Sequence, residues 1–249
     1  MVALMPPRKI GKIVISQSMY FPWVGLLEQV RLADIFVHYD DVQYTRGFFN
    51  RVQIKTAHGM KWITVPIRDL HRGQKINEVY IDDRSDWRSQ HRDILRQAYV
   101  TARFRDEMLA LMDRVFEQPA TTLADVSKAS ILVMADYFGL TDGCHFLDSG
   151  TLGISGSSSQ RLHDIVKTLG GNVYITGHGA RNYLDHYLFE KSGIAVQYMD
   201  YQYIPYPQLH SEFTPYVTAL DLVANRGREG IQVIRSTSID WRDFADEPH

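Results

Sequence analysis

Two stretches of the chain alternate short β-branched runs with helix-length segments, and this alternation restricts the possible folds more than any other feature. In the first stretch, runs at 12–16 and 35–39 flank a helical segment at 26–32. The second stretch holds three runs and two helical segments, at 144–147, 162–169, 173–176, 183–190 and 195–199. Strands joined through helices pair in parallel by right-handed crossovers. The sequence therefore predicts an α/β fold with a mainly parallel sheet flanked by helices.

The residues between the two stretches predict insertions into this sheet. Runs at 52–56 and 62–66 flank a loop that contains Gly59, which is typical of a β-hairpin. A further strand is expected at 77–81, and the pattern over 86–138 is helical. A last helical segment is expected at 216–225, and the tail after Ser236 is expected to be frayed. We predict one domain over 1–249, with an ordered core from about residue 10 to about residue 235.

Charge and cysteine content narrow the partners and the compartment. The 27 basic and 29 acidic residues give a net charge of −2, whereas a dedicated nucleic-acid surface usually makes a domain strongly basic. Cys144 is the single cysteine, so no intramolecular disulfide can form, which suits the reducing cytoplasm. The thiol is expected to be buried. No apolar stretch reaches the 18 or so residues of a membrane span, and the run Ile13-Val14-Ile15 is too short for a signal peptide. We expect neither nucleic acid binding nor membrane insertion.

Ligands of open parallel sheets bind beyond the carboxyl ends of the strands, which directs attention to the turns after Ser16, Leu147 and Thr176. His38, Asp40 and Asp41 cluster at the end of another strand, and alternation places His38 and Asp40 on one side and Asp41 on the other. Beside a cleft, these groups are candidate catalytic residues that take a proton from an attacking amine. The alternative is an Asp pair that accepts hydrogen bonds from loop amides, with a structural histidine.

Other polar residues are candidates for substrate binding. Tyr44, Asn50 and Arg51 follow the same strand, and a guanidinium grips a phosphate or carboxylate through two hydrogen bonds. The turn over 153–161, with Ser157 and Arg161, opens a helix whose amides favour an anion, although Ser is equally a common N-cap.

Two further groups of residues are candidates for ligand binding, and each has an equally simple structural explanation. Gly177 and His178 follow a strand and suit a close ligand or a tight turn. Tyrosines over 198–206 could stack on a base or a sugar, or pack at the edge of the core. Neither a histidine pair with metal-binding spacing nor a Gly-x-Ser-x-Gly elbow occurs, so we assign no metal site and no Ser/His/Asp triad.

An ordered set of short motifs resembles the WbqC-like family, which is found among bacterial O-antigen and other surface-polysaccharide genes. The set runs from about residue 12 to about residue 230 and consists of Gln17, Tyr20-Phe21-Pro22-Trp23, Gly25, Ala33-Asp34, Tyr39-Asp40-Asp41-Val42-Gln43-Tyr44, Phe49-Asn50-Arg51, Trp62-Ile63-Thr64-Val65-Pro66, Trp87, His91, Arg161-Leu162, Tyr174-Ile175-Thr176-Gly177, Tyr183-Leu184, Tyr206-Pro207-Gln208, Phe213-Thr214-Pro215 and Asp221-Leu222. The chain departs from the pattern at Ser18, where the family usually has proline, and at Thr218 and Ala219, where it often has serine.

A weaker similarity concerns the fold. The first strand, its turn and the 157–161 segment are similar to Rossmann-like, nucleotidylyltransferase-like proteins, including pantothenate synthetase. Those enzymes bind ATP phosphates with a His-x-Gly-His motif in the first turn. The corresponding stretch here is Trp23-Val24-Gly25-Leu26, which lacks both histidines, so ATP use is not implied.

The family resemblance implies a transferase that moves an acyl or aminoacyl (glycyl-type) group onto the amino group of a sugar, with a nucleotide-sugar as substrate and an acyl carrier as a candidate donor. It adds Gln17, Tyr20, Gln43, Tyr206 and Gln208 to the expected substrate-binding residues. Two alternatives stay open: an ATP-dependent ligase that forms an acyl-adenylate, which alone would need ATP and Mg²⁺, and a non-catalytic binding protein of the same pathway.

Overall fold

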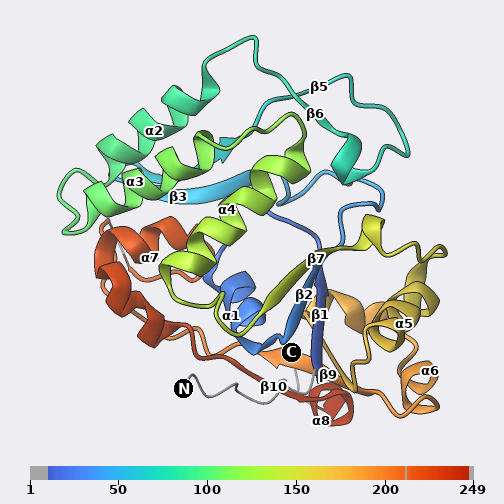
Figure 1. The fold of residues 1–249 in the computed structure, drawn as a ribbon. Helices are drawn as coiled ribbons and strands as arrows, with labels where there is room; N and C mark the ends of the chain where they lie inside the picture. The colour runs from blue at the N-terminus through green and yellow to red at the C-terminus, as the bar shows by residue number, and fades with distance from the viewer. Residues whose placement is uncertain (1–10, 211, 247–249) are drawn as a thin grey trace, which may run out of the picture.

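A six-stranded sheet forms the centre of the protein in a computed structural model that describes residues 11–210 and 212–246 (Figure 1). Neighbouring strands pair in parallel except for β9 and β10, which are antiparallel. The strands, in their order across the sheet, are β10 (Thr237–Asp240), β9 (Ala195–Asp200), β8 (Val173–Thr176), β1 (Lys12–Ser16), β2 (Ile35–His38) and β7 (His145–Asp148). The predicted α/β class with a mainly parallel sheet is confirmed.

The order of the strands reverses at β1, which is the topological switch point of the sheet. From β1 the chain adds β2 and β7 on one side, and it then returns to add β8, β9 and β10 on the other. At such a switch point the loops that leave neighbouring strands diverge, so the carboxyl ends of the strands border an open space. The turns expected to hold ligands therefore lie along one edge of the sheet.

Both faces of the sheet are covered by helices (Figure 1). Val14, Phe36 and Ile175 pack toward α1 (Val24–Leu32), α4 (Leu123–Tyr137) and α7 (Ala219–Arg226). Ile13, Val37 and Tyr174 pack on the other face, toward α5 (Ser158–Thr168), α6 (His186–Glu190) and α8 (Trp241–Asp246). Burial on both faces explains why the strands read as continuous apolar runs and do not alternate with polar residues.

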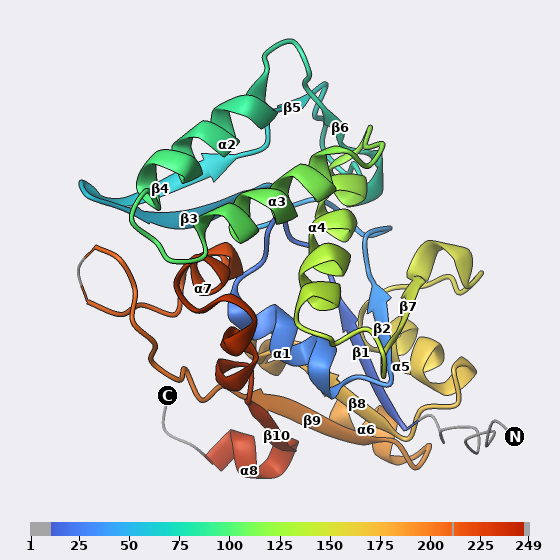
Figure 2. The same cartoon turned by 60° about the vertical axis from the view of Figure 1, so that its left-hand side comes forward.

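The long connection between β2 and β7 forms a second layer above the sheet (Figure 2). Its hairpin consists of β3 (Arg51–Thr56) and β4 (Gly59–Thr64), which pair in antiparallel orientation as predicted. The hairpin packs against α2 (Trp87–Ala98), which continues through α3 (Arg105–Phe116) into α4. The helical middle segment is therefore confirmed.

Three predicted elements differ in the structure. Only Tyr80–Ile81 (β6) of the strand expected at 77–81 is extended, paired with β5 (Ile67–Arg68), because the preceding amides bond to the loop after β2 and form a 3₁₀ turn over Ile76–Glu78. The helix expected at 183–190 begins only at His186, and the one expected at 216–225 begins at Ala219. Their N-caps, Asp185 and Thr218, set these starts.

The prediction of a frayed tail after Ser236 was wrong for residues 237–246, whereas residues 247–249 lie outside the described part of the chain. Thr237–Asp240 form β10, which covers the outer edge of β9, an edge that would otherwise stay open. The tail is then held by Phe244, whose ring stacks on Tyr198 at 4.4 Å and is 2% exposed.

Candidate functional site

Three side chains at the carboxyl ends of β1 and β2 form a buried hydrogen-bonded chain. The Ser18 amide N–H donates to Asp40 Oδ1 at 2.8 Å, and the Ser18 hydroxyl donates to Asp40 Oδ2 at 2.6 Å. The hydroxyl proton is thereby used, so Ser18 Oγ accepts from His38 Nδ1 at 2.8 Å. This order fixes the neutral histidine as its Nδ1–H tautomer and leaves a lone pair on Nε2.

The Nε2 atom of His38 is buried and has no hydrogen-bond partner within the described residues. The ring is 3% exposed and lies against Phe146, with ring centroids 5.9 Å apart. Burial lowers the pKa of His38 to about 4, against a raising effect of Asp148. At neutral pH the side chain is therefore uncharged, and Nε2 is able to accept a proton.

Asp40 provides the other end of the chain. Its carboxylate is 3% exposed. Burial raises the pKa of Asp40 to about 6, although the hydrogen bonds from Ser18 lower it. Asp40 is thus ionised at neutral pH but binds a proton more readily than an ordinary aspartate, and more readily than His38 does.

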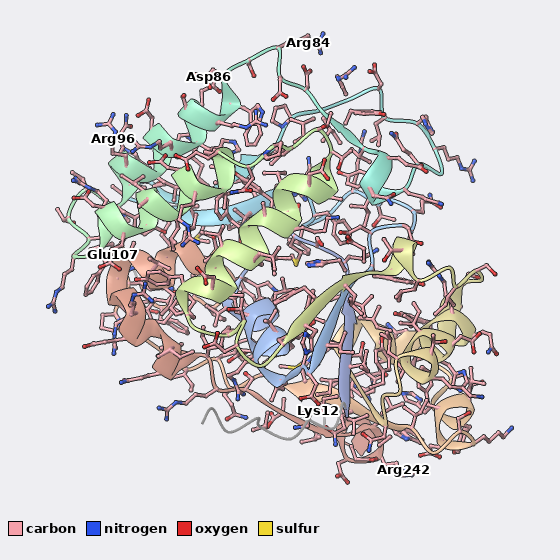
Figure 3. The ribbon with its side chains drawn as sticks, viewed as in Figure 1. Lys12, Arg84, Asp86, Arg96, Glu107 and Arg242 are labelled. Carbon is pink, nitrogen blue, oxygen red and sulfur yellow. The ribbon has the colours of Figure 1, made fainter. Side chains whose placement is uncertain are left out.

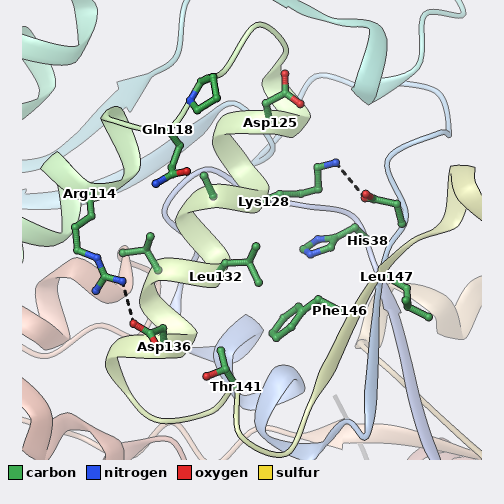
Figure 4. Close-up of a pocket in the computed structure, with 14 residues that line it drawn as sticks. His38, Arg114, Gln118, Asp125, Lys128, Leu132, Asp136, Thr141, Phe146 and Leu147 are labelled. Carbon is green, nitrogen blue, oxygen red and sulfur yellow. Dashed lines mark hydrogen bonds and ion pairs between the residues drawn. The ribbon is translucent and has the colours of Figure 1, made fainter.

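His38 lines a cleft of about 690 Å³ between the end of the sheet and α4 (Figure 4). Figure 4 shows its imidazole between Lys128 of α4 and Phe146 of β7. Two ion pairs border the cleft: Lys128 with Asp148 at 3.0 Å, and Arg114 with Asp136 at 2.9 Å. Asp148 is the register partner of His38 in the parallel pair of β2 and β7. The cleft therefore combines an uncharged base with paired charges that a ligand can exchange.

Asp41 points to the opposite side of the sheet edge, as alternation predicted. Ser149 Oγ and Arg161 Nη2 donate to its two carboxylate oxygens. Burial would raise the pKa of Asp41, but the hydrogen bonds from Arg161 and Ser149 outweigh it and lower the pKa. Arg161 is 5% exposed, also donates to the Ile154 carbonyl and covers the Tyr39 ring. This pair joins α5 to the sheet, and its cation faces an aspartate instead of the cleft.

The other residues expected to bind substrate lie in three places. Tyr20 is fully buried beneath the hairpin layer, where its hydroxyl meets His91 Nδ1 at 2.9 Å. Tyr44 donates to Asn50, whose amide donates to the Val65 carbonyl, so both residues secure the start of the hairpin. Gln43 and Arg51 are exposed beside them, and the Arg51 guanidinium lies 4.6 Å above the Trp62 ring.

Tyr206 and Gln208 belong to a separate buried network. Tyr206 and Tyr99 each donate to Asp221 at 2.8 Å. Gln208 donates to the Tyr206 hydroxyl and accepts from Lys55 of the hairpin at 3.1 Å. The network ties the hairpin to α7.

The turns after β1 and β8 lie next to each other at the switch point of the sheet. Gln17 is partly exposed, and Gly177 lies where a side chain would meet Gln29 and Tyr201. His178 Nε2 lies 2.7 Å from the Met199 carbonyl oxygen, and its ring packs on Tyr201 and Phe244. Ser157 is exposed at the N-cap of α5, and its hydroxyl makes no capping hydrogen bond.

The start of α1, where a nucleotidylyltransferase-like protein would hold phosphate, is closed. A side chain at Gly25 would meet the Trp23 ring at 2.2 Å, because the indole lies over the first turn. Trp23 also forms a backbone bridge to Thr218, and the Ala219 amide donates to the Pro22 carbonyl. The amino-terminal ends of α1 and α7 therefore cover each other.

Sequence reasoning missed Ser18 of the hydrogen-bonded chain and three residues that line the cleft: Lys128, Phe146 and Asp148. Ser18 stood out only as a departure from a family pattern. Asp148 ends a strand that the sequence did predict, at an edge where ligands were expected, so its position was a usable signal. Lys128 and Phe146 carry no local signal, because α4 reaches the sheet only through the tertiary fold.

Metal-binding clusters and membrane-spanning helices are both absent from the part of the chain that the structure describes. No cluster of three or more His, Cys, Asp or Glu side chains is placed to hold a metal ion in residues 11–210 and 212–246. Over the same residues, no helix is long and apolar enough to cross a membrane.

Comparisons with known proteins point to one family. The sequence model of the WbqC-like protein family matches residues 17–233. The uncharacterized protein Rv1507c of Mycobacterium tuberculosis is 33% identical over 228 residues, which cover 90% of this chain and 97% of that protein. No solved structure gives a significant match.

Proposed function

Because the chain belongs to the WbqC-like protein family, we propose that it is a transferase that moves an acyl or aminoacyl group, of the glycyl type, onto the amino group of an amino sugar. The family's association with surface-polysaccharide genes suggests the sugar, and a nucleotide-linked amino sugar is the form to test first. The observation that carries the proposal is the buried, unpartnered Nε2 atom of His38 in a cleft with exchangeable charges.

The charges next to His38 support the proposed substrate class. Asp148 is 44% exposed and holds the ammonium group of Lys128 at 3.0 Å. A sugar ammonium has the same charge and donors as the lysine head group, so it can take the place of Lys128 on Asp148. Since Asp148 is in register with His38, the amine then lies beside the base. The released Lys128 is free to pair with an anionic group of the substrate.

The proton balance of the transfer uses the whole chain of hydrogen bonds. The ammonium held by Asp148 first loses one proton to solvent, which leaves a neutral amine. When this amine attacks the acyl carbon, the new C–N bond leaves a positively charged nitrogen that must lose a second proton. His38 Nε2 accepts that proton, while the Nδ1 proton passes to Ser18 Oγ and the Ser18 proton passes to Asp40. Asp40, whose pKa is about 6, is the better place for the proton than His38, whose pKa is about 4. The acyl carrier leaves with the bonding electron pair and takes up the proton that Asp40 returns through the same chain of hydrogen bonds.

Ser18 serves as a link in this scheme and not as a nucleophile. Its hydroxyl is 0% exposed and lies between His38 and Asp40. In a Ser/His/Asp triad the histidine occupies the middle position and the serine faces the substrate. The order found here suits proton transfer. The acyl group then passes directly from its carrier to the amine, without an acyl-serine intermediate.

The geometry at α1 disfavours the adenylating ligase. Such an enzyme binds ATP phosphates at the first turn after β1, where the Trp23 ring and the start of α7 lie in this protein. Phosphates would need the helix amides that these groups cover.

A thermal-shift panel tests the proposal against its alternatives. Ligands are UDP- and dTDP-amino sugars, acyl-coenzyme A and ATP with Mg²⁺, each at a large excess. A ligand at a hundred times its Kd stabilises the native state by about 2.7 kcal/mol. A shift with an amino sugar and none with ATP supports the transferase, whereas a shift with ATP alone supports the ligase. An amino sugar that binds without being acylated by any donor supports the non-catalytic alternative.

A further inference from the structure

Residues 42–77, the middle of the connection between β2 and α2, carry an unbalanced positive charge, whereas acidic residues flank them on both sides. Residues 42–77 hold seven of the 27 basic residues of the chain but only one of its 29 acidic residues, although the whole chain has a net charge of −2. Lys55 is buried and Arg68 pairs with Asp69. The other five cations are exposed and, within the described residues, none has an ion-pair partner; they are Arg46, Arg51, Lys61, Arg72 and Lys75.

The stretch that follows this segment has a different pattern of charges. Arg84, Arg88, Arg92 and Arg96 follow in the next stretch, and each forms an ion pair with an aspartate. Figure 3 shows Arg84 and Arg96 on the outer side of this layer. The exposed cations of residues 42–77 have no such aspartate partner within the described residues. An acidic partner molecule can supply carboxylates that pair with these cations.

Exposed apolar side chains lie among three of these cations. Phe48 is 60% exposed and Trp62 is 37% exposed, with ring centroids 5.9 Å apart. The Arg51 guanidinium covers Trp62, and Arg46 and Arg51 both act electrostatically on the Tyr44 hydroxyl. Lys75 is adjacent, because it bridges to Gln43 and the Tyr44 amide donates to Gln74. We define the basic patch as Arg46, Phe48, Arg51, Trp62 and Lys75.

The basic patch adjoins the candidate site through the backbone. The segment that carries Lys75 continues to Asn77, whose amide donates to the Asp40 carbonyl at 2.9 Å. A molecule bound at the patch therefore lies next to the loop that holds Asp40.

We infer that the basic patch docks an acidic protein domain, and that this domain is the carrier of the group that is transferred. Aromatic and arginine side chains surrounded by charge are typical of protein–protein contacts, and complementary charge guides the encounter. Trp62 is poorly placed to stack on a nucleic acid base, because the Arg51 guanidinium already covers one face of its ring. The identification of the partner as a carrier rests on the proposed function, whereas the docking of an acidic protein does not.

Binding of a purified holo-acyl carrier protein, a small acidic domain, tests the inference. Wild-type protein is expected to bind it measurably by calorimetry, and more weakly as salt rises from about 50 to about 200 mM. Arg46→Glu with Arg51→Glu should weaken binding at least about tenfold, and Trp62→Ala should also weaken it. Arg96→Glu is the matched control, since Arg96 is 52% exposed but paired with Asp93, and it should bind like the wild type.

Three results would overturn the inference: no binding of the carrier, equal weakening by Arg96→Glu, or tighter binding of duplex DNA or phosphatidylserine vesicles that the same patch substitutions abolish. Should the double variant fail to fold, Lys75→Glu and Arg46→Glu alone, both in exposed loops, provide the same comparison. His38→Gln should bind the carrier like the wild type, so failure of the docking inference is separable from failure of the proposed function.

Discussion

Ser18 Oγ lies 2.8 Å from His38 Nδ1, and this one contact determines which nitrogen of the buried histidine carries the proton. The serine proton is committed to Asp40 at 2.6 Å, so the serine oxygen can only accept from the imidazole. The tautomer of His38 is thus controlled by the ionisation of a carboxylate that it does not touch. A change at Asp40 should therefore be felt at the far side of the His38 ring, where the substrate amine would lie.

Asp40→Asn should reverse the tautomer of His38. The Ser18 amide needs an acceptor, so the asparagine oxygen faces it and the asparagine NH₂ group faces Ser18 Oγ. The serine hydroxyl then donates to His38 Nδ1, which moves the histidine proton to Nε2. Nitrogen-15 NMR of histidine-labelled protein distinguishes the two tautomers. An unchanged Nδ1–H tautomer in the variant would contradict this order of donors and acceptors.

His38→Gln should abolish turnover while the protein still folds and binds its amino-sugar substrate. Loss of a general base typically costs about 10²–10⁴-fold in rate. Turnover is measured with the donor and acceptor identified in the thermal-shift panel, and folding by circular dichroism. His145→Gln is the control, because His145 is exposed at the other end of β7. Equal rates for His38→Gln and wild type would remove His38 from the mechanism.

Ser18→Ala should destabilise the protein by about 1–3 kcal/mol, since it leaves Asp40 Oδ2 and His38 Nδ1 buried without their partner. Ser18→Pro, the residue usual at this position in the family, should cost more here because it also removes the amide donor to Asp40. Urea unfolding measures both. Ser157→Ala, at an exposed hydroxyl without a capping bond, should stay within about 0.5 kcal/mol of wild type. If Ser18→Ala left the free energy of unfolding unchanged, the chain of hydrogen bonds would contribute nothing to folding.

The sequence predicted those parts of the fold and site that depend on local periodicity. Alternation continued beyond β2, which ends at His38, correctly separated His38 and Asp40 from Asp41. It could not reveal that Tyr20 contacts His91, since 71 residues separate them and only the packed hairpin layer joins them. For the same reason it expected Arg161 to face a ligand, whereas Asp41, 120 residues earlier, takes that guanidinium.

Asp41→Asn should destabilise the protein without the loss of turnover expected for His38→Gln. Arg161 is 6% and Asp41 is 14% exposed in the side chain, so the variant leaves a largely buried guanidinium unpaired. Breaking such a pair costs about 2–4 kcal/mol after some allowance for solvent. Because the pKa of Asp41 is lowered, its stabilisation is present above the ordinary aspartate pKa and is lost as pH falls through the folded value. Urea unfolding at pH 7 is the test, and Asp136→Asn, in an exposed pair with Arg114, should cost no more than about 1 kcal/mol.

The raised pKa of Asp40 should appear as a pH-dependent difference in stability between wild type and Asp40→Asn. A carboxyl whose folded pKa is raised from 3.8 to about 6 favours folding most when it is protonated, below pH 3.8, and this contribution is lost as pH rises through about 6. His38 changes stability in the opposite sense between its ordinary pKa and about 4, but it is present in both proteins and largely cancels. The stability of wild type relative to Asp40→Asn should therefore fall by roughly 2–3 kcal/mol between pH 4 and pH 7. Urea unfolding of both proteins across this range gives the difference directly. A difference that is constant with pH would mean that Asp40 keeps an ordinary pKa, and it would then be too weak a base to hold the proton passed on by His38.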